Sequence, residues 1–179
     1  GYENVNVWLL YEDSKRTLWA TTFSNGKLYR LNRTANKFEV VSQQLNNLVA
    51  ITEDSDGNLW GGNSNQLIKI DTLNRQHAFY EMGKPVRAIY EDRKHNFWLG
   101  GEGGGLILFD RKQGKIIQRF SDADGLCNNA VLNIKEDKEG NLWLSTFNGL
   151  SKFDPVKKLF KNFYQSDGLQ SNQFSYNAA

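Results

Sequence analysis

Apolar and polar residues alternate along short stretches of the chain, and residues that favour turns interrupt the alternation every few positions. The stretch 131–137 ends in an acidic pair, and a glycine-containing turn leads from it to a second stretch at 142–146. Another such turn opens a third stretch at 150–154, and a fourth follows at 159–163. A two-residue period with turn residues at each junction predicts four antiparallel strands, which we call A, B, C and D.

The same pattern of four predicted strands occurs four times along the chain, at intervals of about 40 residues. Strand B of each copy contains one of the tryptophans Trp19, Trp60, Trp98 and Trp143. A repeat of this length with four short strands is typical of a β-propeller blade rather than of a helical repeat. A single blade cannot bury both of its faces, so we expect the tryptophans to fill the space between neighbouring sheets.

The repeats predict an all-β fold of four four-stranded antiparallel β-propeller blades. Their predicted boundaries are 1–45 for blade 1, 46–83 for blade 2, 84–127 for blade 3 and 128–169 for blade 4. The segment 170–179 resembles the junction that introduces blade 4, and we expect it to be the first strand of a further, truncated blade. This favours an open arc of a larger propeller, of about seven blades, over a closed ring of four.

The composition agrees with this fold and removes several classes of function. Aromatic residues make up 13% of the chain and there are only 2 prolines, as expected for many short strands. The net charge is +2 with both signs spread along the chain, so we predict no contact with nucleic acid and no binding to a membrane surface. The apolar stretches are too short to span a bilayer, and the single cysteine, Cys127, predicts neither a disulfide framework nor a cysteine metal site.

An acidic pair precedes strand B in every blade: Glu12-Asp13, Glu53-Asp54, Glu91-Asp92 and Glu136-Asp137. Two carboxyl groups can serve as the acid and the base or nucleophile of glycoside hydrolysis. These carboxyl groups, however, are adjacent on a strand and therefore point to opposite faces, and a catalytic pair would not recur in every blade. We predict instead that the aspartate accepts hydrogen bonds from the backbone of the A–B turn.

Three other patterns are better explained as turns or surface residues. Residues 54–58 resemble the first half of a calcium loop, but Asn65 stands where the loop needs a bidentate glutamate. The glycine-rich stretch 100–105 precedes a predicted strand, whereas a phosphate-binding loop precedes a helix. His77 and His95 occupy non-equivalent places in their repeats, and we expect both on the surface. We therefore predict no catalytic residue, no metal site and no cofactor.

A ligand site is expected on the face that carries the B–C and D–A connections. In an antiparallel meander, the B–C and D–A connections lie on the same face. In this sequence these connections vary in length and composition, while the A–B turns are short and uniform. The candidate ligand-binding residues are Phe23, Asn25, Asn63, Asn65, Glu102, Asn128, Asn129, Phe147 and Asn148. Amides, a carboxylate and aromatic rings suit a carbohydrate, although asparagine also favours turns without any ligand.

The repeats resemble the two-component regulator propeller repeats in the sensor region of bacterial hybrid two-component histidine kinases. The shared sequence motifs are E-D-x-x-G-N-L-W at 136–143, G-L-x-x-F-D at 149–154 and D-G-L at 167–169. This resemblance implies the periplasmic part of an inner-membrane receptor of the kind common in Bacteroidetes. Such a receptor detects glycan fragments and regulates polysaccharide-utilisation genes through kinase and output domains outside this chain. The implied partners are an oligosaccharide, the rest of the receptor and, as a further option, a second protomer in a homodimer.

Two other functions stay open from the sequence. Streptogramin-lyase-like enzymes are propellers with comparable repeats, and their chemistry needs a histidine, acidic groups and a metal on one face. Neither His77 nor His95 is near a predicted B–C or D–A connection, which counts against an enzyme. A protein-interaction scaffold, which would bind another polypeptide on the flat face of the blades, is the other alternative.

Overall fold

The computed structural model describes residues 6–22 and 26–176 of the chain. In this part of the chain the strands form four sheets, each of four antiparallel strands paired in sequence order. Blade 1 contains β1 (Val7–Glu12), β2 (Leu18–Thr22), β3 (Lys27–Asn32) and β4 (Lys37–Asn46). Blade 2 contains β5 (Ala50–Glu53), β6 (Leu59–Gly62), β7 (Gln66–Ile70) and β8 (Ala78–Glu81). Blade 3 contains β9 (Val86–Glu91), β10 (Phe97–Gly101), β11 (Gly105–Asp110) and β12 (Lys115–Phe120). Blade 4 contains β13 (Val131–Glu136), β14 (Leu142–Thr146), β15 (Leu150–Asp154) and β16 (Leu159–Phe163). The short 3-10 helices that follow blades 3 and 4 are η1 (Asp122–Asp124) and η2 (Gln165–Asp167).

The prediction of an all-β fold with four four-stranded blades is confirmed. In blade 4, β14, β15 and β16 have the bounds predicted from the alternation, and β13 ends one residue earlier than predicted. The alternation locates these strands well because glycines with positive φ stand in the turns between them. Gly140 has a φ of 84° and Gly149 a φ of 105°, values that other residues rarely adopt.

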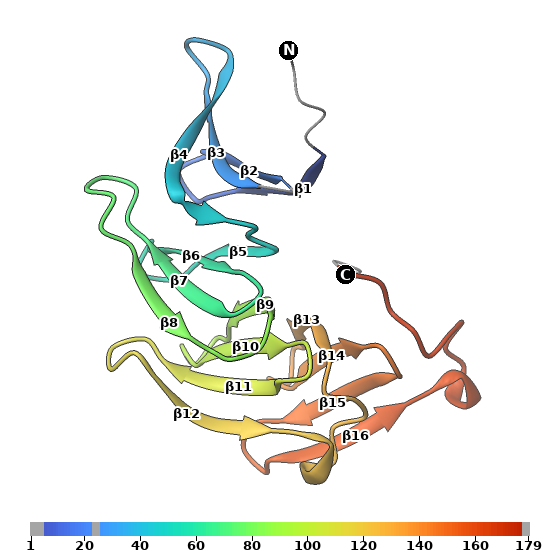
Figure 1. Cartoon of the computed structure of the whole chain (residues 1–179). Coiled ribbons are helices and arrows are strands. Elements are labelled where there is room, and N and C mark those ends of the chain that lie inside the picture. The colour runs from blue at the N-terminus through green and yellow to red at the C-terminus, as the bar shows by residue number, and fades with distance from the viewer. Residues whose placement is uncertain (1–5, 23–25, 177–179) are drawn as a thin grey trace.

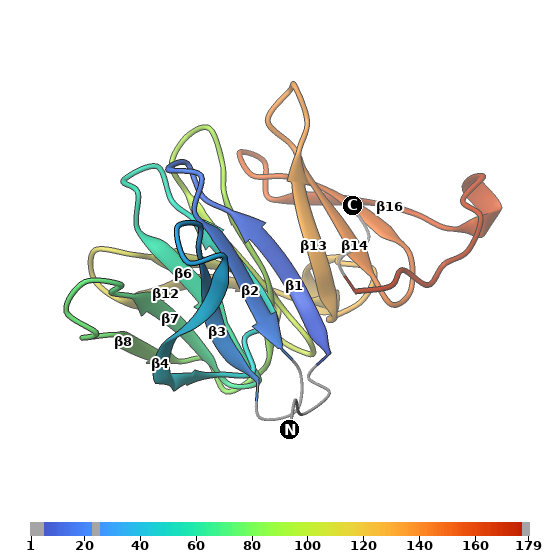
Figure 2. The ribbon, with the colours of Figure 1, turned by 90° about the horizontal axis from the view of Figure 1, so that it is seen from above.

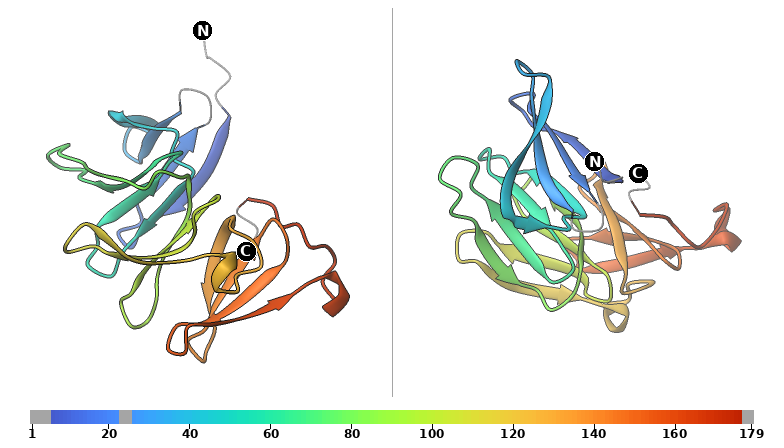
Figure 3. Two further views of the ribbon diagram at one scale, coloured as in Figure 1. Left: turned by 60° about the horizontal axis from the view of Figure 1, so that its bottom comes forward. Right: turned by 45° about the horizontal axis from the view of Figure 1, so that its top comes forward.

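The four sheets are arranged as an open arc, with blades 1 and 4 at its two ends (Figures 1 and 2). The first strand of each blade contacts the first strand of its neighbour: β1 contacts β5, β5 contacts β9, and β9 contacts β13. The views in Figure 3 show blade 4 on the far side of the opening from blade 1. Each interior blade therefore has one face toward the preceding blade and one toward the following blade.

The segment after blade 4 returns toward the inner side of the arc (Figure 1). Its described part, 170–176, forms no strand, but the Gly149 N–H donates to the Asn172 carbonyl at 2.6 Å. The Gly105 N–H donates in the same way to the Asn129 carbonyl, just before β13. The segment thus occupies the place where a next first strand would begin, and its membership of a further blade stays a prediction.

Apolar side chains form three separate cores, one at each interface between neighbouring blades. Between blades 2 and 3, Trp60 is fully buried and its ring centroid lies 5.0 Å from that of Phe97. Trp19 and Trp98 are buried at the other two interfaces, as the repeat predicts. Trp143 stands at the end of the arc and is only partly buried. Burial of each tryptophan therefore depends on the blade that follows it.

The aspartate of each acidic pair holds the A–B turn of its own blade. One carboxylate oxygen of Asp54 accepts the N–H groups of Asp56 and Asn58 at 3.1 and 2.8 Å, and the other accepts the Trp60 indole N–H at 2.7 Å. The equivalent bonds to the indole measure 2.9 Å for Asp13–Trp19, 2.8 Å for Asp92–Trp98 and 2.9 Å for Asp137–Trp143. The predicted turn role of the aspartates is confirmed, and each aspartate also orients its tryptophan.

The glutamates of the acidic pairs in blades 2, 3 and 4 bind the A–B turn of the preceding blade, a contact that the sequence did not reveal. The Glu53 carboxylate accepts the Ser14 N–H at 2.7 Å and the Ser14 hydroxyl at 2.9 Å. The same contact joins Glu91 to Ser55 and Glu136 to the N–H of Arg93. We call this contact the inter-blade latch. The two side chains of an acidic pair point to opposite faces of the strand. The aspartate therefore bonds within its own blade, and the glutamate bonds to the preceding blade.

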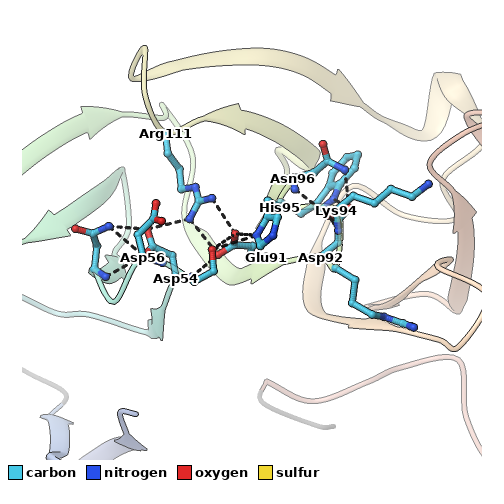
Figure 4. A network of polar contacts seen from close by, with 12 residues as sticks. Asp54, Asp56, Glu91, Asp92, Lys94, His95, Asn96 and Arg111 are labelled. Atoms are coloured by element: carbon cyan, nitrogen blue, oxygen red, sulfur yellow. Dashed lines mark hydrogen bonds and ion pairs between the residues drawn. The ribbon is translucent and has the colours of Figure 1, made fainter. Parts of the chain in front are cut away.

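A buried arginine reinforces the latch between blades 2 and 3 (Figure 4). Arg111, in the C–D turn of blade 3, donates to Glu91 at 2.8 and 3.0 Å and lies 2.9 Å from the Asp54 carboxylate of blade 2. His95 Nδ1 also lies 2.9 Å from Glu91. The side chains of Arg111, Asp54 and Glu91 are only 15%, 1% and 9% exposed. Removing one partner would leave a shielded charge without its counter-ion.

Replacing Trp60 with alanine should lower the free energy of unfolding by about 3–5 kcal/mol, because the whole indole leaves a buried interface. Trp143→Ala removes the same side chain and the same bond to aspartate from a partly exposed position, and it should cost clearly less. Urea unfolding of the two variants measures the difference. Equal losses would show that burial between blades does not set the contribution of the tryptophans.

The latch at Glu91 should also make stability depend on pH. Burial alone would raise the pKa of Glu91, but hydrogen bonds from Ser55, His95 and Arg111 outweigh it and lower the pKa from 4.5 to about 2. The folded protein therefore binds this proton less tightly than the unfolded chain does. The stabilisation is complete above pH 4.5 and is lost as the pH falls toward 2.

Glu91→Gln should accordingly lower the free energy of unfolding by about 2 kcal/mol at neutral pH. Its deficit relative to the wild type should shrink as the pH falls below 4.5. Glu39→Gln, at an exposed ion pair with Arg30, is the matched control and should change stability little. Urea unfolding across this pH range gives the measurement, and a deficit that does not change with pH would contradict the latch.

Candidate functional site

The predicted ligand residues that the structure describes lie on the B–C and D–A connections. Phe23 and Asn25 fall outside the described residues. Backbone hydrogen bonds hold these connections together: the Val86 N–H, at the start of β9, donates at 2.9 Å to the carbonyl of Asn63 in a B–C turn. The bond from Gly105 to the Asn129 carbonyl, described above, does the same one blade further on. Each B–C turn is thereby fixed against the D–A connection that follows its blade.

Asparagines in these connections also have structural roles. Side-chain oxygens accept backbone N–H groups of the same loop at 2.8 to 3.0 Å in Asn63, Asn128 and Asn129. The Asn65 amide donates to the Glu81 carboxylate, and Asn148 is exposed. These bonds show the turn-forming role that the sequence left as an alternative for the asparagines. The residues whose chemistry goes beyond turn formation are Glu102 and Phe147.

Glu102 and Phe147 belong to one group of side chains, which we call the axial cluster: Trp8, Arg87, Glu102, Phe147 and Tyr176. Arg87 and Glu102 form an ion pair at 2.6 Å and are 20% and 30% exposed. The Arg87 guanidinium lies 4.8 Å from the centroid of the Tyr176 ring, and the Tyr176 hydroxyl lies 3.4 Å from Glu102. The rings of Trp8 and Phe147 lie 6.0 and 5.6 Å from that of Tyr176. Tyr176 thus joins the ion pair to the two other aromatic rings.

A β-bulge places Arg87 and Trp8 in this cluster. The pairing of the first two strands shifts by one residue at Trp8 in blade 1, Arg87 in blade 3 and Leu132 in blade 4. A bulge bends the strand locally and redirects a side chain. Sequence reasoning missed Trp8 and Arg87, because strict alternation contains no information about a bulge. It also missed Tyr176, which lies after the last complete blade. The one available signal was an arginine at a repeat position that is apolar in the other blades, with Val49 in blade 2.

Several hollows lie along the blades. A cleft of about 120 Å³ follows the first strands of the blades, and Arg87 lines it. Two larger grooves, of about 530 and 510 Å³, lie between the A–B and C–D turns of blades 1 and 2 and of blades 2 and 3, on the face opposite the B–C turns. Lys69 lines both grooves, whose walls include Trp19 and Asp54. These grooves have the volume of a small-molecule site, but several of their polar walls already serve the Asp–Trp turns and the latches.

The two histidines lie away from the axial cluster, and the described residues contain no group of side chains arranged to hold a metal ion. Within residues 6–22 and 26–176, no three or more histidine, cysteine, aspartate or glutamate side chains are grouped to hold a metal ion. His95 lies in an A–B turn beside Glu91, and His77 accepts the Asp71 N–H at the C–D turn of blade 2. Burial lowers the pKa of His77, against the opposing effect of the Asp71 charge. Both histidines are therefore at the opposite ends of the strands from the axial cluster.

The described part of the chain also contains no helix that is long and apolar enough to cross a membrane.

Comparison with known proteins gives matches in both sequence and structure. Residues 81–103 and 125–148 match the family model of the two component regulator propeller. The chain is 24% identical to histidine kinase P4 of Formosa agariphila, over 97% of this chain and 14% of that protein. It is therefore similar to a short part of a much longer protein.

Several solved structures share the fold, among them the following three. The extracellular domain of the putative hybrid two component system BT3049 of Bacteroides thetaiotaomicron gives a TM-score of 0.79 at 23% identity, over 94% of this chain and 24% of that one. The extracellular domain of the putative one component system BT4673 of the same organism gives 0.82 at 20% identity, over 98% and 27%. A catalytically inactive virginiamycin B lyase of Staphylococcus aureus gives 0.71 at 16% identity, over 88% and 55%.

Four-stranded meanders set side by side with their first strands innermost define the chain as an arc of β-propeller blades. The family match, which spans the junctions on both sides of blade 3, makes the class more specific. Two segments of the chain match the two-component regulator propeller repeat, and the resemblance inferred from the sequence is confirmed.

Proposed function

We propose that this chain is the extracytoplasmic, ligand-sensing part of a hybrid two-component sensor kinase and that its ligand is an oligosaccharide. The observation that carries the proposal is the axial cluster, in which Tyr176 contacts both the Arg87–Glu102 ion pair and the rings of Trp8 and Phe147. The presence of the same repeat family in sensor proteins supports the class of function.

The chemistry of the cluster fits a sugar better than an apolar ligand. A sugar ring has an apolar face that can stack on an aromatic ring such as Phe147, and its hydroxyls can both donate and accept hydrogen bonds. Glu102 offers acceptor oxygens and Arg87 offers donors in a fixed plane, both partly exposed. Charge-assisted bonds of this kind are stronger than those between neutral groups.

Binding alone can drive signalling if the ligand prefers one arrangement of the receptor. The shift in the equilibrium between two arrangements equals the difference in the free energy of binding to them, and no catalysis in this chain is needed. Blades joined by latches suit a rigid-body movement relative to neighbouring domains. In this proposal the parent kinase and its output domains, which act from the other side of the inner membrane, regulate polysaccharide-utilisation genes while this part faces the periplasm.

A lyase function is the second candidate, because virginiamycin B lyase shares the fold. Its inactive variant carries a histidine-to-alanine substitution, which indicates that a histidine is needed there. In this chain His77 and His95 are both engaged at turns on the face opposite the axial cluster. A protein-interaction scaffold needs no such residue, and a ligand screen separates it from a sugar sensor.

The sugar proposal predicts that the chain binds at least one member of a broad oligosaccharide panel in calorimetry. Phe147→Ala and Glu102→Gln should each weaken that binding about tenfold, through loss of a stacking surface and of a charged acceptor. Lys69→Ala is the matched control. Lys69 lines both grooves on the opposite face and does not belong to the axial cluster. Its affinity should equal that of the wild type.

Three results would count against this proposal in different ways. Absence of binding to every sugar in the panel would reject the sugar as the ligand. Weaker binding by Lys69→Ala, with Phe147→Ala unaffected, would place the site in the grooves. Consumption of a streptogramin by the chain would favour the lyase function.

A further inference from the structure

The arginine that reinforces the interface between blades 2 and 3 is an internal reference for the other two interfaces (Figure 4). The Arg111 guanidinium donates to both carboxylate oxygens of Glu91 at 2.8 and 3.0 Å, and it lies 2.9 Å from the Asp54 carboxylate. The aspartate of one acidic pair and the glutamate of the next therefore hold one planar cation between them. A guanidinium matches a carboxylate through two parallel N–H donors, which a lysine ammonium does not offer.

Blade 2 has a threonine at the position of this arginine. The Asp71 carboxylate accepts the second and third N–H groups after it at 2.9 Å each, and Asp110 accepts the equivalent groups of blade 3 at 2.8 and 2.9 Å. Thr72 and Arg111 each directly follow that aspartate. The C–D turns of the two blades thus begin with the same hydrogen bonds, and only the side chain that faces the preceding blade differs.

The two carboxylates that would hold such a cation are nevertheless present between blades 1 and 2. Glu53 accepts the N–H and the hydroxyl of Ser14 at 2.7 and 2.9 Å, which is the contact that Glu91 makes one blade further on. Asp13 accepts the Thr17 N–H at 2.7 Å within its own turn. In the described part of the chain, no lysine, arginine or histidine forms an ion pair with Glu53 or Asp13.

The interface between blades 3 and 4 also supplies a cation for its latch, from a different position. Pro155 follows Asp154 in the C–D turn of blade 4, so no arginine comes from that turn. Arg93, in the A–B turn of blade 3, instead pairs with Glu136 at 3.2 Å. Among the three latch glutamates of the described residues, Glu53 is therefore the one without a cationic partner.

A groove of about 530 Å³ gives a ligand access to these carboxylates, and its walls include Glu53, Asp13 and Thr72. The volume is in the range of sites that bind small molecules or short segments. Both walls belong to blades 1 and 2, which pack on each other through a common core. A further blade at either end of the arc would therefore leave this groove open.

The cations in the walls of the groove do not replace Arg111. Arg30 pairs with Glu39 at 3.6 Å, on the outer side of blade 1. The Lys69 ammonium lies over a tryptophan ring, 5.8 Å from its centroid, and Lys15 is exposed in its turn. Each of these groups lines the groove without forming an ion pair with the latch.

We propose that this groove binds an arginine side chain presented by another polypeptide segment. The guanidinium would lie between Glu53 and Asp13, as that of Arg111 lies between Glu91 and Asp54. The same kind of carboxylate pair already binds this group in the neighbouring interface, which identifies the chemical class of the ligand.

A peptide fits the groove better than a small guanidine does. Beyond the two carboxylates, the hydroxyl of Thr72 and the amide of Gln76 line the groove and can bond to a peptide backbone. The arginine of the reference interface is itself carried by a turn of polypeptide. The groove lies on the face opposite the axial cluster, so the proposal goes beyond sugar sensing and does not rest on it.

Titration of the chain with a capped Ala-Arg-Ala peptide, followed by nuclear magnetic resonance of the backbone N–H groups, tests the site. The signals of Ser14 and Thr72 should shift and saturate. A capped Ala-Lys-Ala peptide should bind about tenfold more weakly, because an ammonium cannot form two parallel bonds to one carboxylate. Methylguanidinium should also bind more weakly than the arginine peptide, because it has no backbone for the rest of the groove.

The two C–D turns allow reciprocal substitutions. Thr72→Arg supplies the guanidinium from within the chain, so it should abolish binding of the peptide and raise the urea concentration at the midpoint of unfolding. Thr34→Arg adds the same side chain to the C–D turn of blade 1, outside the groove, and as the matched control should bind like the wild type. Arg111→Thr removes the guanidinium between blades 2 and 3 and should create a second site for the peptide.

Absence of saturable shifts with the arginine peptide would overturn the proposal. Equal affinity for the lysine peptide would overturn the guanidinium as the ligand, and equal affinity for methylguanidinium would overturn a polypeptide as its source. Binding that persists in Thr72→Arg would place the site away from Glu53 and Asp13. These titrations contain no sugar, so their failure would leave the axial cluster and its ligand untouched.

Discussion

The glutamate that reaches back to the turn of the preceding blade is the contact on which the rest of the arrangement depends. Each blade is a small sheet with two apolar faces, and burial of those faces supplies most of the favourable energy. Apolar burial has no direction, however, and could be satisfied at many relative positions of two sheets. A carboxylate that accepts an N–H and a hydroxyl of one serine, as Glu53 does from Ser14, allows one position only. The position of each blade is thus set by hydrogen bonds, while apolar contact makes it favourable.

That fixed arrangement brings the axial cluster together. Arg87 and Glu102 come from blade 3, whereas Trp8, Phe147 and Tyr176 come from blade 1, from blade 4 and from the segment after it. No single blade could assemble this group. A ligand bound at this group would contact several blades at once, which suits movement of the blades as one rigid body relative to neighbouring domains.

The strands and the turn aspartates could be predicted from the sequence because their causes are local. Alternation and positive-φ glycines located β14 to β16, and the hydrogen bonds of the Asp13 carboxylate extend only to residues up to Trp19. The role of Glu91 could not be predicted in this way, because its partner Ser55 belongs to another repeat. The bulge at Arg87 was missed for a similar reason, since a one-residue shift in pairing leaves no trace in a binary pattern. The candidate ligand residues included Glu102 and Phe147 but also asparagines whose oxygens serve their own loops.

The acidic pair has a consequence for how such a protein can change over generations. Each blade encodes an acceptor for the blade before it and a donor for the blade after it, within one stretch of about 40 residues. A gene segment that is duplicated in tandem would therefore yield a new blade already compatible with both neighbours. Deletion of a whole repeat would likewise rejoin two compatible surfaces. The number of blades can thus vary among descendants of one ancestor without any simultaneous change elsewhere in the chain.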